Sequence, residues 1–416
     1  MSGDIEIREL RAGEEEALRA CLNVAFHEAT GAEAMGLWLG LIGHARTAVA
    51  VEGERLVGTS GAFSRPLSLP GGGELGCAGI TIITVLPTHR RRGLLTRMMA
   101  RLLEQAVEAG EPLAGLWAAE GGIYGRFGFG VASRAVTVEL PGGSGALAWG
   151  PSGTYAFELV SAADAPALVE PVWAALRARR AGVPARPWAW WTDDVFYDPE
   201  EERDGAREQR IVVARASSDD GGSGAVAGYA LYRARPAEPH PTLEVLELHG
   251  VTPDAEAALW EYVRSIDLVS KVVANDRPLD DPLLLRTADA REPKVTALSD
   301  ALWLRLVDVP VALEHRGWVA GFPLDLTLAV HDPQLPANAG PWRLQVSADG
   351  TASCTSTDAS PDLTLPADTL GALYLGGTSP LLLLDASRLT EHTPGATERL
   401  TAALRTPRLP YTPDHF

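Results

Sequence analysis

The alternation of apolar and polar residues predicts strands and helices in turn along the first third of the chain. Gly79–Val85 is a run of small and β-branched residues typical of a strand, and Pro87 closes it. From Leu94 to about Val107, apolar residues recur every three or four positions, as on one face of a helix. Other strand-like and helix-like segments precede and follow this pair. The pattern therefore predicts an α/β or α+β sheet with helices packed on it.

Three interruptions of this pattern suggest how the chain is divided. Pro141–Gly153 is rich in glycine and serine and separates a compact N-terminal segment from the rest. Ser217–Gly224 is similar in composition, but strand-like runs flank it, so a hairpin loop is the better interpretation. Near Arg291–Ala297 the pattern changes again, and strand-like runs then alternate with turn signals. At 416 residues the chain is also too long for one ordinary core, so we expect about three domains.

A later segment repeats the outline of the strand, turn and helix. Glu247–Ile266 has a strand-like run, a Val-x-Pro step and then a helical pattern. Where residues 90–93 are Arg-Arg-Arg-Gly, residues 256–259 are Glu-Ala-Ala-Leu. A shared fold would make the later segment part of a non-catalytic copy that has lost the charged turn. A chance match between two ordinary strand–helix units is the alternative.

Composition narrows the class of protein. The formal net charge is −18, with 46% hydrophobic and 22% charged residues, as in a soluble globular protein. This acidity argues against a nucleic-acid partner and is compatible with a cationic substrate. The three cysteines lie far apart without metal-type spacing, which favours a reducing compartment and no bound metal. The sequence has no apolar signal core and no run of membrane-spanning length, so we expect a cytoplasmic protein without membrane contact.

Three consecutive arginines stand at the start of the predicted helix, where cations are normally disfavoured. Backbone N–H groups leave that end partly positive, so an anion is expected to join them. Gly93 would let a ligand approach the backbone, and guanidinium groups bind phosphate through paired hydrogen bonds. The stretch is neither a Walker loop nor a GxGxxG dinucleotide turn. It predicts a cradle for a diphosphate, with an ordinary solvated basic turn as the alternative.

The same residues carry a resemblance to a known superfamily. Val85, Pro87, Arg90 and Gly93 match V-x-P-x-x-R-x-x-G, which resembles the acetyl-CoA motif of the GCN5-related N-acetyltransferases (GNAT). Leu95, two places after the glycine, departs from the small residue common there. Longer sequence segments, spread along the whole chain, are similar to the Eis (enhanced intracellular survival) branch. They are "PTHRRRGLL", "EGGIYGRFGFG", "LWLRLVDVPVALEHRGW", "LYLGG" and a terminal Phe416.

Membership of this branch implies an α+β chain with two tandem GNAT-type folds followed by a sterol-carrier-protein-like α/β domain. We place a catalytic GNAT domain at residues 1–147, a degenerate GNAT-like domain at 148–292, and the carrier-like domain, ending in the catalytic carboxylate, at 293–416. The resemblance also implies a homohexamer. Its implied reaction uses acetyl-CoA, without a metal, to acetylate several primary amines of small polycationic acceptors such as aminoglycosides or lysine side chains. Transfer would be direct, in a ternary complex.

By position, the resemblance assigns the residues that hold the co-substrate. Backbone groups of one strand would contact the pantetheine and acetyl group, the arginine–glycine turn would hold the diphosphate, and the end of the next strand would line the co-substrate. In that order these are Ile83, Thr84 and Val85; Arg91, Arg92, Gly93, Leu94, Leu95 and Thr96; and Ala119 and Glu120.

Acetyl transfer to an amine requires a base for the ammonium and is helped by an acid for the departing thiolate. The resemblance assigns the acid to Tyr124. The chemistry permits this role, because a phenol of pKa about 10 can protonate a thiolate of pKa about 8.5 at a cost of about 2 kcal/mol. The glycines around it favour close backbone approach to a ligand, whereas a lone tyrosine is more often a core aromatic. The family's base is the carboxylate of the last residue, here Phe416, on a tail stiffened by Pro410 and Pro413. A frayed terminus is the alternative.

Glu28 and Trp38 match an acidic and an aromatic position that shape the acceptor pocket in the family. A carboxylate pairs with an ammonium group, and an indole face attracts one; each residue could equally be ordinary surface or core. The penultimate position, often acidic in relatives, is His415, which leaves the preferred substrate charge open. Two other functions stay open: a CoA-binding scaffold without catalysis, and a lipid-binding protein acting through its last domain.

Overall fold

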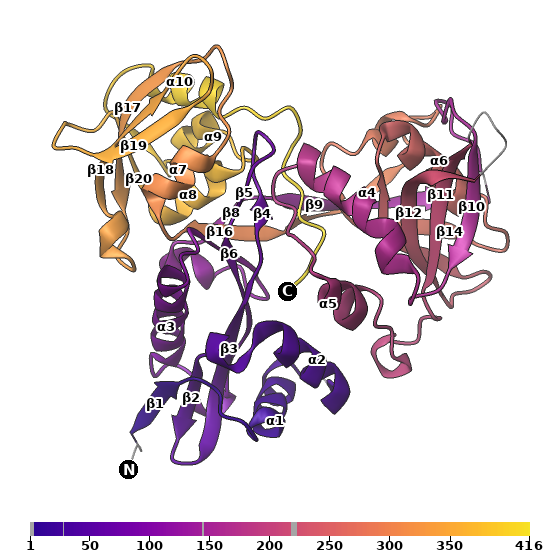
Figure 1. Ribbon diagram of the computed structural model, residues 1–416, viewed down its shortest axis with the longest axis horizontal. Helices are drawn as coiled ribbons and strands as arrows, with labels where there is room; N and C mark the ends of the chain where they lie inside the picture. The colour runs from indigo at the N-terminus through magenta and orange to yellow at the C-terminus, as the bar shows by residue number, and fades with distance from the viewer. Residues whose placement is uncertain (1–3, 28, 144, 218–222) are drawn as a thin grey trace. The chain divides into compact units, whose positions relative to one another are not determined.

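The computed structural model describes residues 4–27, 29–143, 145–217 and 223–416 (Figure 1). Contacts divide the chain into two compact units. The first unit holds the residues up to Ser133 together with Asp300–Pro410 and Asp414–Phe416, and the second holds Arg134–Ser299 and Tyr411–Pro413. The domain boundaries expected at 147/148 and 292/293 stay predictions, because units defined by contacts need not coincide with domains defined by sequence.

A seven-stranded sheet forms the N-terminal part of the first unit. Strands β6 and β7 run parallel, and the remaining neighbours run antiparallel. Strand β16 comes from far along the chain and lies between β7 and β8. In order across the sheet, the strands are β1 (Ile5–Arg8), β2 (Val49–Glu52), β3 (Arg55–Ser64), β6 (Cys77–Val85), β7 (Leu113–Trp117), β16 (Leu302–Leu306) and β8 (Gly130–Val131), and a separate hairpin is formed by β4 (Leu67–Ser68) and β5 (Glu74–Leu75).

Three helices cover this sheet, with α3 (Leu94–Glu108) on one face and α1 (Glu15–Phe26) and α2 (Ala32–Ile42) on the other (Figure 1). The helix predicted from Leu94 is confirmed as α3, and the strand predicted at Gly79–Val85 is confirmed as part of β6. Helix α3 forms there because apolar side chains at three- and four-residue spacing bury one face against the strands. Its buried apolar residues are Leu94, Met98, Met99, Leu102, Leu103 and Ala106.

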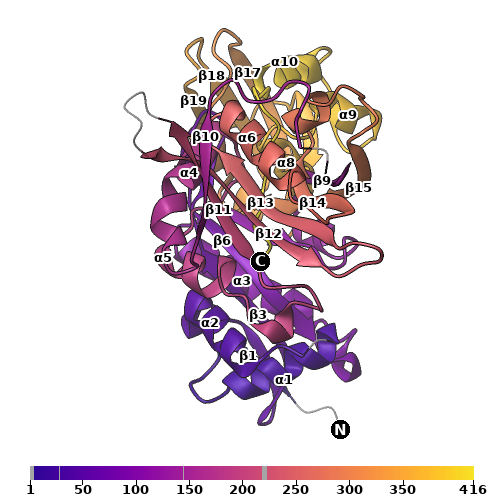
Figure 2. The ribbon, with the colours of Figure 1, turned by 90° about the vertical axis from the view of Figure 1, so that its right-hand side faces the viewer.

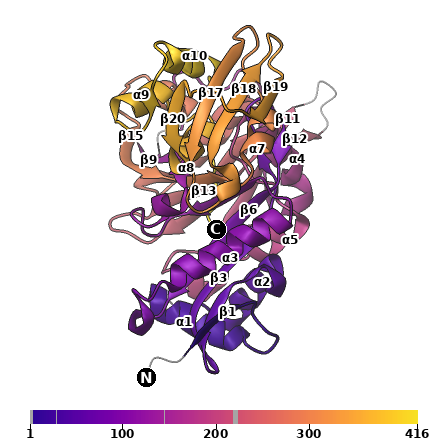
Figure 3. The same cartoon turned by 90° about the vertical axis from the view of Figure 1, so that its left-hand side faces the viewer.

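The last part of the first unit is a five-stranded sheet with four short helices (Figure 3). Strand β17 runs parallel to β20 and antiparallel to β18. Helix α8 packs against β16 and β8 of the seven-stranded sheet. The strands, in order across the sheet, are β19 (Ala352–Ser356), β18 (Gly340–Val346), β17 (Leu324–His331), β20 (Leu363–Pro366) and β21 (Thr390–Glu391), and the helices are α7 (Val309–His315), α8 (Ala367–Tyr374), α9 (Pro380–Asp385) and α10 (Ala396–Ala403).

The second unit is built on another seven-stranded sheet (Figure 2). Across it the strands are β10 (Tyr155–Val160), β11 (Arg210–Ser217), β12 (Ser223–Arg235), β13 (Thr242–Gly250), β14 (Lys271–Pro278), β9 (Arg134–Pro141) and β15 (Lys294–Asp300), and the helices are α4 (Ala165–Arg179), α5 (Trp188–Trp190) and α6 (Pro253–Arg264). The predicted hairpin loop falls partly on residues 218–222, outside the described residues, but its flanking strands β11 and β12 do pair antiparallel. Strand β13 followed by α6 is the strand–helix frame expected from the internal repeat.

All three cysteines, Cys21, Cys77 and Cys354, are free and buried. Burial raises the pKa of each thiol, to about 12 for Cys354. None of the helices in the described ranges has both the length and the apolar composition required to cross a lipid bilayer.

Candidate active site

The two parallel strands of the first sheet separate part-way along their length. Their pairing joins Cys77–Gly79 of β6 to Leu113–Gly115 of β7 and goes no further. Strand β6 continues to Val85, paired on its other edge with β3. On the edge facing β7, residues 80–85 of β6 therefore have no strand partner among the described residues. We call this opening, between residues 80–85 of β6 and the end of β7, the splay.

A bulge in β6 accompanies the splay. The register with β3 shifts between the pairs Thr59↔Thr84 and Gly61↔Thr81, so β6 has one extra residue there. Ile82, at the bulge, has a φ of +48°, a left-handed conformation that costs a β-branched residue free energy. The Thr59 hydroxyl donates a hydrogen bond to the Ile82 carbonyl oxygen at 2.7 Å. The surrounding structure thus holds a strained backbone next to the opening.

Three buried side chains form a directed chain of hydrogen bonds that ends at this bulge. Thr59 has one hydroxyl hydrogen, and it goes to Ile82. Thr84 Oγ1 lies 2.8 Å from Thr59 Oγ1, so the Thr84 hydroxyl must be the donor of that pair. Cys21 Sγ lies 3.7 Å from Thr84 Oγ1, and its raised pKa keeps the thiol protonated and able to donate. The order from Cys21 through Thr84 and Thr59 leaves each acceptor satisfied.

The arginine–glycine turn lies between β6 and α3 and is exposed. Arg91 and Gly93 have φ values of +64° and +75°, and Gly93 is the residue before the first turn of α3. Among the described residues, no side chain caps that helix end, and a Cβ added at Gly93 would meet nothing within 4 Å. The first turn of the helix has no acidic residue. Unpaired N–H groups, open space and guanidinium side chains together suit a diphosphate.

Glu52, at the end of β2, faces this turn. Its Oε1 lies 3.4 Å from Arg92 Nη1, and its Oε2 lies 3.2 Å from Nε2 of the buried His89. The hydrogen bond from His89 is the main reason why the pKa of the Glu52 carboxyl is lowered. Arg90 and Arg91 make no ion pair with any described residue, so most of the positive charge of the turn is free.

Tyr124 opens a 3-10 turn, Tyr124–Phe127, and its ring is buried. The ring meets Phe129 edge-on at 6.5 Å between centroids. Burial, and then the charge of Glu120, raises the pKa of the phenol. Among the described residues the Tyr124 hydroxyl has no hydrogen-bond partner. Its ring shares one apolar cluster with residues of the splay and the turn, namely Ile83, Val85, Leu94, Leu95 and Ala118.

Two glycines after Tyr124 make close contact with protein. Gly128 is one of the glycines expected to let a ligand approach, and at that position the expectation is wrong. A Cβ at Gly128, whose φ is +84°, would collide with the guanidinium of Arg305. A Cβ at Gly130 would collide with the carbonyl oxygen of Asp368 in α8. Both glycines are required because Arg305 of β16 packs on the first and α8 of the carrier-like part packs on the second.

The last three residues are anchored where β6 and β7 separate. Asp414 forms a buried ion pair with Arg65. The His415 ring stacks on Trp117, the last residue of β7, at 3.8 Å between centroids and 21° between planes. The Phe416 ring packs so close to Gly79 that a Cβ there would lie 3.1 Å from Phe416 Cε2. Gly79 is the last residue of β6 that pairs with β7, so the chain end lies at the splay.

Within the second unit, the segment just before the chain end is also held. The backbone N–H of Tyr411 donates to Ala181 O at 2.9 Å, and the Thr412 hydroxyl donates to Gly182 O at 2.8 Å. The frayed terminus considered as an alternative is therefore not what the structure shows.

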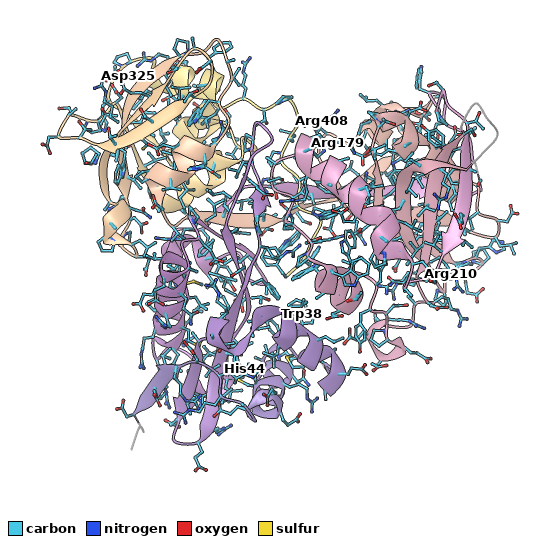
Figure 4. All side chains as sticks on the ribbon, in the orientation of Figure 1. Trp38, His44, Arg179, Arg210, Asp325 and Arg408 are labelled. Carbon is cyan, nitrogen blue, oxygen red and sulfur yellow. The ribbon has the colours of Figure 1, made fainter. Side chains whose placement is uncertain are left out.

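The aromatic position of the expected acceptor pocket lies near the chain end. Trp38 on α2 (Figure 4) packs against Phe63 with 5.4 Å between ring centroids, and Phe63 meets Phe416 edge-on at 6.3 Å. Ala119 and Glu120 follow β7 and are exposed. Glu28, the expected acidic position, lies outside the described residues. The structure thus links Trp38 to Phe416 through the ring of Phe63.

Comparisons with known proteins agree with this geometry. Acetyltransferase (GNAT) domain models match residues 6–132 and 182–306, and a sterol carrier protein domain model matches residues 309–413. An uncharacterized N-acetyltransferase of Streptomyces avermitilis is 39% identical over 394 residues, which is 93% of each chain. The N-acetyltransferase Eis of Mycobacterium tuberculosis is 33% identical over 363 residues, covering 84% of this chain and 83% of the relative. The crystal structure of Eis1 from Mycobacterium abscessus covers 99% of this chain and 100% of its own, with a TM-score of 0.83 at 30% identity.

This chain belongs to the Eis-like N-acetyltransferases. The fold implied by the resemblance, two GNAT domains followed by a sterol-carrier-protein-like domain, is confirmed. The protein is an enzyme of the acyltransferase class, and its GNAT domains imply acetyl-CoA as co-substrate.

The second GNAT fold of this Eis-like enzyme has a different helix start. Thr252 caps α6 by accepting a hydrogen bond from Ala255 N, and Asp254 and Glu256 stand in the first turn. The pKa of Asp254 is lowered to about 2, chiefly because its carboxylate accepts hydrogen bonds from backbone N–H groups. An anion bound there would face the carboxylate of Asp254, and a Glu256 already paired with Arg179, instead of three guanidinium groups.

The second fold differs from the first at the corresponding opening between its two parallel strands, where a side chain of the protein takes up a backbone acceptor. Strands β13 and β14 pair only from Thr242–Val245 to Lys271–Ala274. Beyond that point, the buried Arg277 donates through Nη1 to Leu248 O at 2.9 Å, so a backbone acceptor of β13 is already taken. In this Eis-like enzyme, the repeat keeps the frame of a GNAT fold and lacks the cradle.

Sequence reasoning missed Thr59, Arg65 and Asp414. Their contacts join residues 23 and 349 positions apart in the chain, so no local pattern identifies them. The one available signal in this Eis-like sequence was the presence of two ionisable residues, Asp414 and His415, in a tail that otherwise looks apolar and proline-rich.

Proposed function

We propose that this enzyme transfers the acetyl group of acetyl-CoA directly to primary amines of small polycationic acceptors, several per molecule, in a ternary complex. Aminoglycosides and lysine side chains are the acceptor classes in view. The observation that supports the proposal is the anchored chain end, whose last side chain packs against Gly79, where β6 and β7 of a GNAT fold separate. A homohexamer and a cytoplasmic location stay predictions.

The co-substrate would be held by two parts of the first GNAT fold. Backbone groups of Ile83, Thr84 and Val85 would receive the pantetheine arm, since the edge of β6 is open there. The diphosphate would be bound by side chains of the turn and by N–H groups of the first turn of α3. Those residues are Arg91, Arg92, Gly93, Leu94, Leu95 and Thr96, and the exposed Ala119 and Glu120 would line the arm from the end of β7.

Proton transfer would be shared by the chain end and a phenol. The terminal carboxylate of Phe416, with an ordinary pKa near 3.5, would accept a proton from the substrate ammonium. The amine nitrogen then attacks the thioester carbon, the new C–N bond forms, and the C–S bond breaks. The nitrogen releases its second proton, which replaces the one that Tyr124 gives up. Tyr124 would give its proton to the departing thiolate, since burial keeps its phenol neutral. Trp38, with Glu28, would attract the cationic acceptor.

Altering the chain end tests the proposal. We expect deletion of Phe416, or a peptide fused after it, to lower thiol release by about 100-fold or more, because general-base catalysis of this kind contributes about 10² to 10⁴. Acetyl-CoA should still raise the melting temperature of both variants, and the same peptide fused to the N-terminus is the matched control. Tobramycin, spermidine and a lysine peptide serve as acceptors.

Two results would count against the assignment. Unchanged turnover in the deletion variant would remove the terminal carboxylate from the reaction. Acetyl-CoA binding without thiol release from any of the three acceptors in the intact enzyme would favour the CoA-binding scaffold instead.

A further inference from the structure

The turn that carries Tyr124 is held by a buried guanidinium. Arg305, on β16, has no exposed surface. One of its nitrogens, Nη1, donates to the carbonyl oxygen of Phe127, the last residue of the turn. Its other terminal nitrogen, Nη2, donates to both carboxylate oxygens of Asp332, at 2.8 and 2.6 Å. The turn is therefore tied through one side chain to a residue that directly follows β17.

Asp332 is itself fixed in place. It is 3% exposed. Its Oδ1 accepts hydrogen bonds from the backbone N–H groups of Gln334 and Leu335 at 3.1 and 3.0 Å, and its Oδ2 accepts one from Asn338 Nδ2 at 3.3 Å. A carboxylate with this many donors has one orientation, so it holds the Arg305 guanidinium in one orientation too.

Further contacts join the same turn to the carrier-like part of the chain. Gln334 Nε2 donates to the carbonyl oxygen of Arg126, inside the turn, at 3.3 Å. Gly130 and Gly371 lie where any side chain would collide with the backbone of the facing element. The turn is thus fastened at Arg126 and Phe127, and the strand that follows it is fastened at Gly130, all within six residues of Tyr124.

Tyr124 depends on this support more than most buried tyrosines would. Its hydroxyl has no hydrogen-bond partner among the described residues, so no polar contact orients the phenol. The direction of the ring follows from apolar packing and from the backbone of a turn only four residues long. Whatever fixes that backbone fixes the hydroxyl.

We propose that Arg305 and Asp332 are positioning residues for Tyr124, and that the sterol-carrier-protein-like domain serves this enzyme by holding the turn of its general acid. This inference rests on the proposed function, because it takes Tyr124 as the acid. It gives the third domain a role in acetyl transfer that requires no lipid ligand.

The test is a double-mutant cycle on the full-length enzyme. Arg305→Lys keeps a positive charge opposite Asp332, but one ammonium cannot reproduce the fork that also reaches Phe127. We expect Arg305→Lys to lower kcat by about 10-fold or more with the KM for acetyl-CoA within about 2-fold of wild type. In a Tyr124→Phe background the same substitution should lower kcat by less than about 2-fold, because the group it positions is gone.

A matched control is available in the same part of the chain. Arg316 is equally buried and donates to the carbonyl oxygens of Tyr374, Gly317 and Leu404, away from the turn. Arg316→Lys should lower the melting temperature without a loss of kcat that depends on Tyr124. Should Arg305→Lys fail to fold, Gln334→Ala replaces it in the cycle, with an expected loss in kcat of about 3-fold that disappears in the Tyr124→Phe background.

Equal losses from Arg305→Lys, or from Gln334→Ala, in both backgrounds would overturn the inference, as would no loss in either. The failure of the proposed function is a separate result, since Tyr124→Phe alone would then retain full activity.

Discussion

At the scale of single residues, the proposed function depends on groups whose environment changes an ordinary property. Tyr124 is a buried phenol whose pKa is raised, and Ile82 is a β-branched residue in a left-handed conformation. The assignment of Tyr124 came from family resemblance, because a buried tyrosine alone is more often core. The support of Ile82 by Thr59 could not be predicted, since strain and long-range hydrogen bonds leave no local pattern in a sequence.

The raised pKa of Tyr124 gives a pH prediction. A phenol whose pKa in the folded enzyme is above its ordinary value of about 10 stays protonated at every pH below that value. We therefore expect kcat to show no falling limb between pH 7 and about pH 10. The Tyr124→Phe enzyme should lose about 100-fold or more in kcat at every pH in this range.

The raised pKa of Tyr124 also makes the folded state less stable at high pH. A neutral buried phenol contributes stability below about pH 10, and this contribution is lost as pH rises further, because the unfolded state ionises first. Urea denaturation between pH 9 and pH 11 should show a steeper loss of stability for wild type than for Tyr124→Phe. A falling limb of kcat near pH 8 that is absent from Tyr124→Phe would contradict the assignment.

Thr59 allows a second prediction at this scale. Thr59→Val removes the donor to Ile82 O and the acceptor of Thr84, so two buried groups lose a partner. We expect a loss of about 1–3 kcal/mol in the free energy of unfolding, together with a fall in kcat as the bulge relaxes. Thr59→Ser keeps the hydroxyl and should behave nearly as wild type. Equal effects of the two substitutions would show that packing, and not the hydroxyl, matters here.

At the scale of elements, the sequence predicted what is local and missed what depends on distant pairing. The strand, turn and helix at residues 79–107 were predicted because hydrophobic spacing and the arginine–glycine turn are local signals. The position of β16 beside β7 was not predicted, since strand order in a sheet is set by contacts between segments far apart in sequence. The candidate site combines both kinds of element, so local patterns could indicate the arginine–glycine turn but not the strands and chain end that lie beside it.

The C-terminal tail gives the prediction that belongs to this scale. Asp414→Arg and Arg65→Asp each set two like charges against each other in a buried site, which should cost at least the roughly 3–5 kcal/mol lost when a buried ion pair is broken. Each should also displace Phe416 and lower kcat by about 10-fold or more. The Arg65→Asp/Asp414→Arg double variant restores opposite charges and should recover much of both losses, measured by thermal unfolding and thiol release. No recovery in the double variant would show that the ion pair is not what anchors the tail.

At the scale of the whole chain, two GNAT folds and a carrier-like domain share one sequence, but they are not equivalent in chemistry. The first fold has an open splay and a basic helix start, whereas the second has an arginine in its splay and two acidic residues at its helix start. Tandem folds were predicted from an internal repeat, because the strand–helix frame survives in the sequence after the charged turn has changed.

This difference predicts the number of co-substrate molecules bound. Isothermal titration with acetyl-CoA should give one site per chain, with no second, weaker site at millimolar concentration. Arg91→Ala/Arg92→Ala should weaken that site by about 10-fold or more, because each lost charge-assisted contact to phosphate is worth about 1.5–3 kcal/mol. Arg405→Ala, an exposed arginine elsewhere, is the control. Two sites per chain would mean that the second fold still binds acetyl-CoA.

The burial of Cys21, Cys77 and Cys354 has a practical consequence for handling this enzyme. Maleimides and disulfide reagents attack exposed thiolates, and each of the three sulfurs is both covered and kept protonated. The folded protein should therefore tolerate mild oxidants and alkylating probes without inactivation. The rate at which such a probe labels the thiols would therefore measure unfolding, since labelling would begin only when the core opens.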